Sequence, residues 1–285
     1  MKKSIIILIL AVILPLSCTE VIPQGSTPRL VVEGWIESGG HPMVTLTESL
    51  VVEMGKDITT GDLVESLAKW ARVTVSDGDT TVILTGVVDA NYFPPYVFSS
   101  SKLTGEVGKT YELRVEYKDY VASARTTIPE PVPLDTVYVA TVSDSLCSVA
   151  CGFTDPLKKG NYYKIFTKTE GVDTHYHSSV LALLDGDPLQ GYSEIALFST
   201  QRMMDLVGAP NLFVGDNLWV KLCTMDREAF NFWKHYEVIL YANMFNVESG
   251  TEMHGNVQGA LGYWIGYGVD KPVRIHLEDP SVPTK

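Results

Sequence analysis

The sequence predicts a mainly β protein in two parts, the second of which carries one amphipathic helix. Three observations support this class. Short segments rich in β-branched and aromatic residues recur along most of the 285 residues, turn residues separate them, and one stretch has the apolar spacing of a helix. With 45% hydrophobic and 20% charged residues, the composition is that of a globular protein.

The first part is predicted to extend over residues 29–128. Its strands are predicted at residues 30–36, 43–47, 71–75, 81–85, 96–99, 110–117 and 120–127. Asp77-Gly78 and Lys118-Asp119 predict tight hairpins, and residues 62–70 predict a short helix or an ordered loop. Seven short strands in about 100 residues are typical of a β-sandwich, and we expect an immunoglobulin-like one.

Three prolines between residues 129 and 134 predict an extended linker, because proline cannot donate to a central strand. The second part, residues 135–285, is also mainly β. Its strands are predicted at residues 137–142, 146–153, 162–168, 179–184, 194–199, 218–223, 260–267 and 273–277.

One helix is predicted within this second part, over residues 226–244. Apolar residues recur there at spacings of three and four, with polar residues on the opposite side. The apolar members are Ala229, Phe232, Trp233, Tyr236, Ile239 and Leu240. An aromatic stripe of this kind is usually a face that packs on a sheet, and we expect that role here.

The N-terminus predicts export and lipidation. Lys2 and Lys3 precede ten consecutive apolar residues, which is too short a run to span a bilayer and is typical of a signal peptide. Leu14-Pro15-Leu16-Ser17-Cys18 resembles a bacterial lipobox, so we expect cleavage after residue 17 and acylation of Cys18. Two or three acyl chains would anchor the protein firmly to a membrane without spanning it. Residues 18–28 are then expected to form a tether. The alternative to a lipoprotein is an ordinary secreted protein in which Cys18 carries no lipid.

The net charge argues against some binding partners, and the cysteine positions argue against most disulfides. The formal net charge of −12 becomes more negative if Lys2 and Lys3 are removed, which disfavours binding to nucleic acid or anionic lipid surfaces. Apart from Cys18, the cysteines are Cys147, Cys151 and Cys223. Cys147 and Cys151 are too far apart along a strand to form a disulfide, so we expect buried thiols or at most one bridge to Cys223.

The sequence also resembles a family of Bacteroidetes lipoproteins that carry the domain of unknown function 4249. The resemblance rests on four segments: residues 30–36 (LVVEGWI), Asp155-Pro156 with Asn161-Tyr162-Tyr163, residues 215–218 (GDNL), and Asn256 through Gly259 to residues 261–264 (LGYW). It implies an accessory role in nutrient capture beside a TonB-dependent outer-membrane transporter. It supplies no catalytic residues.

Thr19 after Cys18 favours sorting to the outer membrane, on the periplasmic face or at the cell surface.

Several motifs are candidate sites of chemistry. His175 and His177 are expected on one face of a strand and could begin a metal site, although surface histidines are the simpler interpretation. Asp77-Gly78-Asp79 and Asp185-Gly186-Asp187 are similar to the start of calcium loops, but turn formation explains both. Gly191 to Ile195, around Ser193, fails the pattern of a nucleophile elbow. We therefore predict no cofactor, no metal and no catalytic residue.

Two aromatic clusters are the candidate ligand-binding residues. The first comprises Tyr92, Phe93 and Tyr96, and the second Tyr263, Trp264 and Tyr267. Exposed aromatic rings provide a face for stacking sugar rings or for holding a protein partner, whereas the alternative is that they pack in the core.

The function we expect is therefore a lipid-anchored binding protein of the outer membrane. Two alternatives stay open: a structural or adhesive surface protein, and a hydrolase of glycans or peptides, since a fold alone does not choose among them.

Overall fold

The computed structural model describes residues 28–50, 59–92, 94–157, 160–189, 191–197, 212–244 and 255–278. The predicted signal peptide, Cys18, residues 18–27 of the predicted tether and Phe93 lie outside these residues. Within the described ranges, no helix has both the length and the apolar character needed to cross a membrane.

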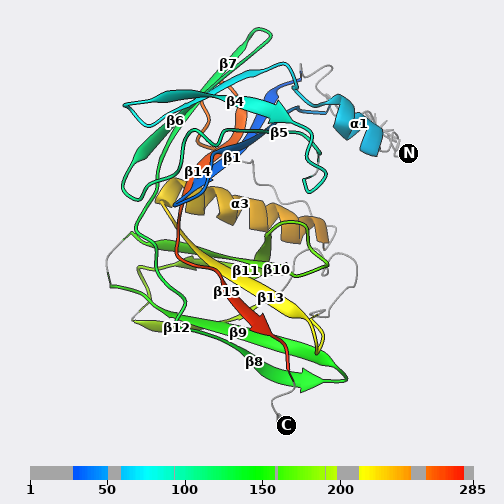
Figure 1. Cartoon of the computed structure of the whole chain (residues 1–285), viewed down its shortest axis with the longest axis vertical. Helices are drawn as coiled ribbons and strands as arrows, with labels where there is room; N and C mark the ends of the chain where they lie inside the picture. Colours follow the sequence, from blue (N-terminus) through cyan, green and yellow to red (C-terminus); the bar gives the residue numbers. More distant parts are fainter. Residues whose placement is uncertain are drawn as a thin grey trace, which may run out of the picture.

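The protein is mainly β, as predicted, and its strands form two sheets (Figure 1). The first seven strands are β1 (Leu30–Glu37), β2 (Met43–Glu48), β3 (Arg72–Ser76), β4 (Thr81–Val87), β5 (Val97–Ser99), β6 (Thr110–Tyr117) and β7 (Tyr120–Thr127). The others are β8 (Thr136–Ser143), β9 (Leu146–Thr154), β10 (Tyr162–Thr169), β11 (His177–Asp185), β12 (Tyr192–Leu197), β13 (Asn217–Met225), β14 (Leu261–Val269) and β15 (Val273–His276). The helices are α1 (Thr60–Glu65) and α3 (Arg227–Met244).

The larger sheet has twelve strands in the order β11-β10-β13-β14-β1-β2-β5-β4-β3-β6-β7, with β15 paired to β13. The smaller sheet has the order β12-β9-β8. Along β6 and β7 every second residue is buried, because the side chains of a strand point alternately into the core and away from it. Both strands have the bounds that the sequence predicts.

The first seven strands enclose one hydrophobic core. Val32, Ile36 and Val44 from β1 and β2 belong to the same buried cluster as Val75 and Leu113 from β3 and β6. Strand β14 completes this core although it comes from the C-terminal part of the chain. It pairs in parallel with β1, and its Trp264 has no exposed surface. Residues on both sides of the predicted linker therefore contribute to the first core.

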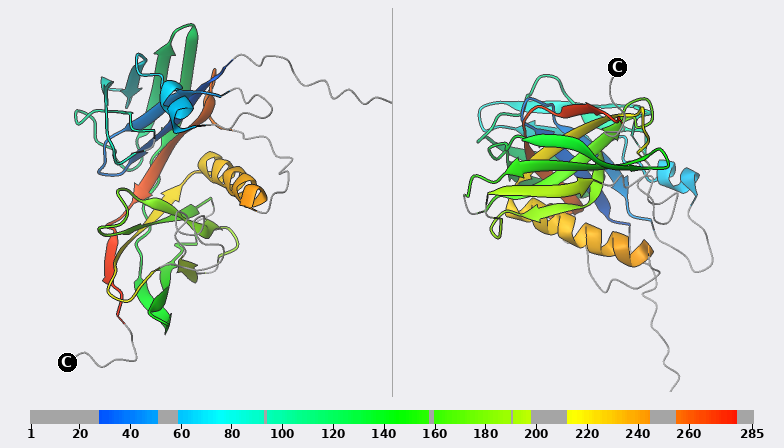
Figure 2. Two further views of the ribbon diagram at one scale, coloured as in Figure 1. Left: turned by 90° about the vertical axis from the view of Figure 1, so that its right-hand side faces the viewer. Right: turned by 90° about the horizontal axis from the view of Figure 1, so that it is seen from below.

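A second core lies between the three-stranded sheet and the strands β10, β13 and β15. The opposite face of β10 and β13 packs against α3, where Ala229 and Phe232 are buried beside Tyr162 and Met225. Alternate residues of one strand thus serve the two faces, as with Tyr162 and Tyr163. Figure 1 and the left view of Figure 2 show α3 at a level between the strands of the first core and the lower strands.

Candidate functional site

The candidate site begins with the pairing of β1 and β14. Glu33 pairs with Tyr263 and Glu37 pairs with Tyr267, while Gly34 pairs with Trp264. Because side chains alternate across a strand, the first two pairs lie on one face and the third pair lies on the other. Trp264 faces the core, so the charged and phenolic side chains project from the outer face of the first sheet.

That outer face forms one wall of an open groove with a volume of about 1400 Å³. Five other parts of the chain also line the groove: α3, the strands β10 and β13, the turn at residues 90–92, and the segment between residues 172 and 178. Its aromatic lining residues are Trp35, Tyr92, Phe166, Tyr176, Trp233, Tyr236, Tyr263 and Tyr267. A concave site of this size, lined by rings and a few polar groups, has the general character of a ligand site.

The rings are held in fixed positions by one another. Phe166 makes edge-to-face contacts with Trp233 and Tyr267, with ring centroids 5.7 and 5.8 Å apart. The Trp233 Nε1–H donates to the Tyr267 hydroxyl at 2.8 Å. Phe232 lies behind Tyr263, with centroids 4.3 Å apart. Aromatic pairs of this geometry contribute more free energy than the burial of their surface alone provides. The rings of the lining are therefore held in place before a ligand binds.

Two lysines are placed in or beside the groove, each against a carboxylate and a ring. Lys221 Nζ donates to Glu37 Oε1 at 2.5 Å and lies 4.5 Å from the centre of the Tyr176 ring. Lys164 is fully buried, donates to Glu237, and lies 5.4 Å from the Trp233 ring. Burial lowers the pKa of Lys164, and Glu237 offsets part of that shift.

Glu33 is the charged residue of β1 without such a neighbour. It lines the groove and its side chain is open to it. The protein atoms that surround the carboxyl displace water, and this desolvation raises its pKa above 4.5. Among the described residues, none forms an ion pair with Glu33. A nearby cation would stabilise a carboxylate in this position, and no described residue supplies one.

The structure separates the predicted aromatic residues into two groups. Tyr92, Tyr263 and Tyr267 line the groove. Trp264 and Tyr96 do not: Trp264 donates from Nε1 to the Tyr111 carbonyl oxygen at 3.0 Å within the core, and Tyr96 packs against the outside of that core. Phe93 lies outside the described residues, as does the predicted lipidation site Cys18.

His175 and His177 lie side by side, with ring centroids 4.3 Å apart, and both line the groove. Tyr92 stacks on His175 at 5.3 Å. His177 also lies near Asp173, with Nε2 and Oδ1 3.9 Å apart. Within the described ranges, no three histidines, cysteines or acids gather as metal ligands would. The pair thus belongs to the wall of the groove.

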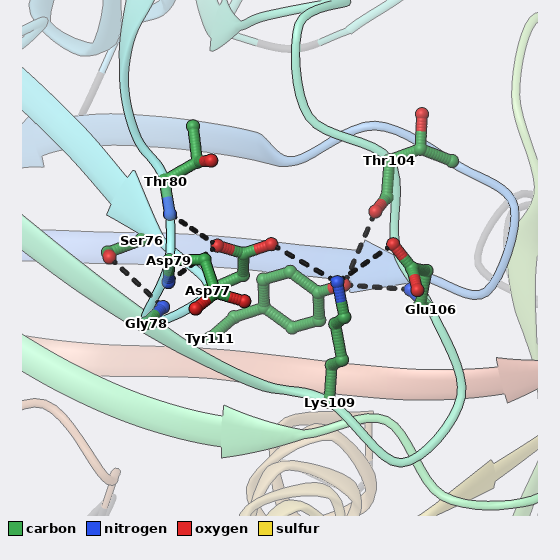
Figure 3. Close-up of polar contacts among 9 residues, drawn as sticks. All are labelled: Ser76, Asp77, Gly78, Asp79, Thr80, Thr104, Glu106, Lys109 and Tyr111. Carbon is green, nitrogen blue, oxygen red and sulfur yellow. Dashed lines mark hydrogen bonds and ion pairs between the residues drawn. The ribbon is translucent and has the colours of Figure 1, made fainter.

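The candidate calcium loop at Asp77 forms a turn, which Figure 3 shows in detail. Asp77 Oδ1 accepts backbone N–H groups from Asp79 and Thr80 at 3.2 and 2.8 Å. Its Oδ2 accepts from Lys109 Nζ at 3.4 Å, and these hydrogen bonds lower the pKa of Asp77. Because its oxygens already accept from protein donors, the turn interpretation holds. Asp185 similarly accepts the Asp187 N–H at 3.0 Å.

The three cysteines in the described residues, Cys147, Cys151 and Cys223, are buried thiols, in agreement with the expectation. Burial raises the pKa of Cys151 to about 12 and raises that of Cys223 as well. Both therefore stay protonated at neutral pH and are poor nucleophiles.

Sequence reasoning missed five groove residues: Trp35, Phe166, Tyr176, Trp233 and Tyr236. Trp35 lies in the segment of residues 30–36 that supports the family resemblance. Its place between Gly34 and Ile36, which are buried, indicates that its side chain points away from the core. Trp233 and Tyr236 were assigned to helix packing. They do pack, partly buried, against the cluster that contains Ala229 and Phe232, and they also line the groove.

Two of the segments that support the family resemblance, those with Asn256 and Asp155, have structural roles. Asn256 holds β14 by donating to the Trp264 carbonyl and accepting from the Trp264 N–H, both at 2.8 Å. Asp155 is buried and accepts from the Tyr163 hydroxyl and from the Leu157 N–H. These contacts position β14 and β10, which carry part of the groove.

Fold and groove together define a class: a mainly β protein with an aromatic groove between its two cores. The chain belongs to the family described as Domain of unknown function (DUF4249), which matches residues 19–272. No curated protein sequence matches the chain.

Two solved structures show distant likeness. One, described as a cytokine receptor complex, is 9% identical with a TM-score of 0.27, and the alignment covers 88% of this chain and 98% of that one. The other is a DUF4785 family protein from Legionella pneumophila, 10% identical with a TM-score of 0.22, covering 69% and 52% of the two chains. Likeness at this level carries no argument about fold or function.

Proposed function

We propose that this protein captures a ligand in the aromatic groove. The observation that carries the proposal is the groove itself: eight aromatic residues from six parts of the chain converge on one open cavity of about 1400 Å³. Rings held in place by their neighbours provide binding area at low entropic cost.

The charges favour binding over hydrolysis. Glycoside cleavage needs two carboxyl groups that act as acid and base, or as acid and nucleophile. Among the residues that the structure describes, three acids line the groove: Glu37 is paired with Lys221, and Asp270 follows the end of β14, seven residues beyond the Tyr263 that pairs with Glu33. At about 3.3 Å per strand residue, Asp270 and Glu33 are too far apart to form a catalytic pair. A hydrolase is therefore the weaker alternative for this groove.

The experiment that tests capture compares two tryptophans. Trp35 lines the groove, whereas Trp70 is 91% exposed and is not part of the groove lining. The chain is purified gently from its own envelope and analysed by native mass spectrometry. We expect a bound small molecule on the wild-type and Trp70→Ala chains and its loss from Trp35→Ala. Equal retention by all three chains would contradict capture in the groove.

The envelope context is a second part of the proposal. We propose that Cys18 carries lipid, that the protein is a Bacteroidetes outer-membrane lipoprotein, and that it works beside a TonB-dependent transporter. The motifs around Cys18 and the family membership support this. Intact mass of the natural protein tests lipidation. Affinity isolation from native membranes tests the partner: recovery of such a transporter supports it, and recovery of this chain alone counts against it.

We further propose that residues 29–128 form an immunoglobulin-like sandwich. The strand order β1-β2-β5-β4-β3-β6-β7 supports it, because β1-β2-β5 and β3-β6-β7 correspond to the two sheets of such a sandwich. Tyr111, near the start of β6, supports it too. Its hydroxyl donates to the Thr104 carbonyl at 3.2 Å and accepts from the Glu106 N–H at 2.8 Å, contacts that resemble the tyrosine corner of these folds (Figure 3).

A further inference from the structure

An arrangement in which an ammonium group lies between a carboxylate and an aromatic ring occurs once in the groove and once beside it. In the first copy, Lys221 is paired with Glu37 at 2.5 Å and lies over the rings of Tyr176 and Phe166, at 4.5 and 5.5 Å. A cation gains from both partners at once, since the face of a ring carries negative electrostatic potential.

The second copy lies beside the first, where α3 meets β10. Lys164 is paired with Glu237 and lies 5.4 Å from the centre of the Trp233 ring. Its Nζ also donates to the Ser179 carbonyl oxygen at 2.8 Å. Lys164 can stay in a fully buried position because these neighbours replace the water it loses.

Glu33 provides the carboxylate of a third copy. In the register of the sheet it stands beside Tyr263 on β14 and Thr45 on β2, and all three line the groove. Tyr236 on α3 lines the same groove and provides a second ring. Burial raises the pKa of both Tyr236 and Tyr263, and the negative charge of Glu33 raises both further. Both tyrosine rings pack against Phe232, which fixes their positions.

Among the described residues, nothing supplies the ammonium group of this third copy. Within the part of the chain that the structure describes, no lysine, arginine or histidine pairs with Glu33. The carboxylate is nevertheless open to the groove, so a charge delivered by a ligand can reach it. A ligand cation would occupy the place that Lys221 and Lys164 occupy in the other two copies.

We propose that the groove binds an organic cation, whose amine or quaternary ammonium group lies at Glu33 against Tyr236 and Tyr263. This deepens, and rests on, the proposed capture function. An organic cation fits better than a metal ion because the neighbours of Glu33 are rings rather than further oxygen or nitrogen ligands. The acidic net charge of −12 also favours the approach of cations.

The test uses the full chain and three probes measured by calorimetry. Choline carries a quaternary ammonium group, 3,3-dimethyl-1-butanol is its neutral analogue of the same shape, and maltotriose is a neutral sugar. We expect choline to bind and its neutral analogue to bind at least about tenfold more weakly, because a charged interaction is lost.

Matched variants locate the charge. Glu33→Gln should weaken choline binding at least about tenfold, since it removes the charge and keeps the shape. Glu65→Gln changes an exposed glutamate on α1, away from the groove, and should leave binding unchanged. Tyr236→Phe should retain binding and Tyr236→Leu should weaken it, because only the first keeps an aromatic face.

A second readout follows the carboxyl group itself. Bound choline should lower the pKa of Glu33, as observed by NMR of the ¹³C-labelled carboxyl group, because it stabilises the charged form. Thermal unfolding of each variant shows that it is folded when measured.

Three results would overturn the cation proposal: no choline binding by the wild-type chain, equal binding of choline and its neutral analogue, or equal binding of choline by wild type and Glu33→Gln. If maltotriose binds instead and Trp35→Ala abolishes that binding, the groove still captures a ligand, and only its cationic character is refuted. Loss of capture as such is detected separately, by the comparison of Trp35→Ala with Trp70→Ala.

Discussion

At the scale of single residues, strand alternation decides which side chains of β1 and β14 reach the groove. Trp35 and Tyr263 face it, while their sequence neighbours Gly34 and Trp264 face the first core. The adjacent residues Tyr263 and Trp264 therefore differ completely: the first ring can contact a ligand, and the second is fully buried.

Glu33 predicts a pH dependence of stability. Its pKa in the folded protein is raised above 4.5 by desolvation, so the folded state disfavours the charged form. Below about pH 4.5 the carboxyl group is protonated in both states and has no cost; as the pH rises through the folded pKa, it destabilises the native protein. We expect the stability of Glu33→Gln relative to wild type to increase with pH, measured by urea unfolding without ligand at about pH 4 and about pH 7.5. A difference that shrinks with pH would contradict this.

Tyr111 predicts a hydrogen-bond contribution to stability. Tyr111→Phe removes the hydroxyl that joins Thr104 and Glu106, and leaves a carbonyl and an N–H group of the backbone without that partner. We expect a loss of about 1–3 kcal/mol in the free energy of unfolding, measured by denaturant titration.

The matched control for Tyr111 is Tyr192→Phe. Tyr192 is 54% exposed, and water can replace its hydroxyl contact with Thr136. Its cost should stay within about 0.5 kcal/mol. Equal effects of the two substitutions would show that the hydroxyl of Tyr111 has no special role.

At the scale of elements, β14 joins the two cores. It pairs in parallel with β1 along seven residue pairs and pairs with β13 at Cys223 and Thr224. The Gly266 N–H also donates to the buried Thr126 hydroxyl of β7, at 2.7 Å. Close approach of β14 to its neighbours therefore positions Tyr263 and Tyr267 in the groove.

Gly262 makes that approach possible, and its replacement predicts a large loss of stability. Gly262 has φ +106, and a Cβ there would overlap the Val32 carbonyl oxygen. Gly78 has a similar φ of +94 but open space around it. Gly78→Ala should cost about 1–2 kcal/mol from backbone strain alone, and Gly262→Ala about 2–5 kcal/mol in total, because overpacking adds to the strain. Denaturant unfolding measures both, and equal losses would contradict the role given to close packing.

At the scale of the whole molecule, the two parts share one sheet. The large sheet extends from β7 through β1 and β14 to β11, and Lys221 on β13 pairs with Glu37 on β1. The groove forms where these parts meet, so its shape depends on both of them.

This arrangement predicts that the first part is not stable alone. A fragment of residues 28–134 lacks Trp264, which is fully buried in the first core. Removing such a ring costs about 3–5 kcal/mol, which is a large share of the stability of a typical domain. We expect no cooperative unfolding of the fragment by circular dichroism, and partial recovery when a peptide of residues 255–272 is added. A fragment that unfolds cooperatively with the midpoint of the full chain would refute the prediction.

The sequence alone was sufficient for the class of fold and for most element positions. The strands at 110–117 and 120–127, the helix near 226–244 and the buried thiols are all present as predicted. These features depend on local periodicity and turn chemistry, which a single segment carries within itself.

Tertiary structure decided the site. Tyr92, Tyr263 and Tyr267 could be named from the sequence, but not their meeting with Phe166, Trp233 and Tyr236, nor the burial of Trp264. Local pattern shows that a ring lies on one face of a strand, and not which distant element covers that face. Here the parallel pairing of β1 with β14 brings together residues about 230 positions apart, and only that long-range contact determines which rings and charges share the groove.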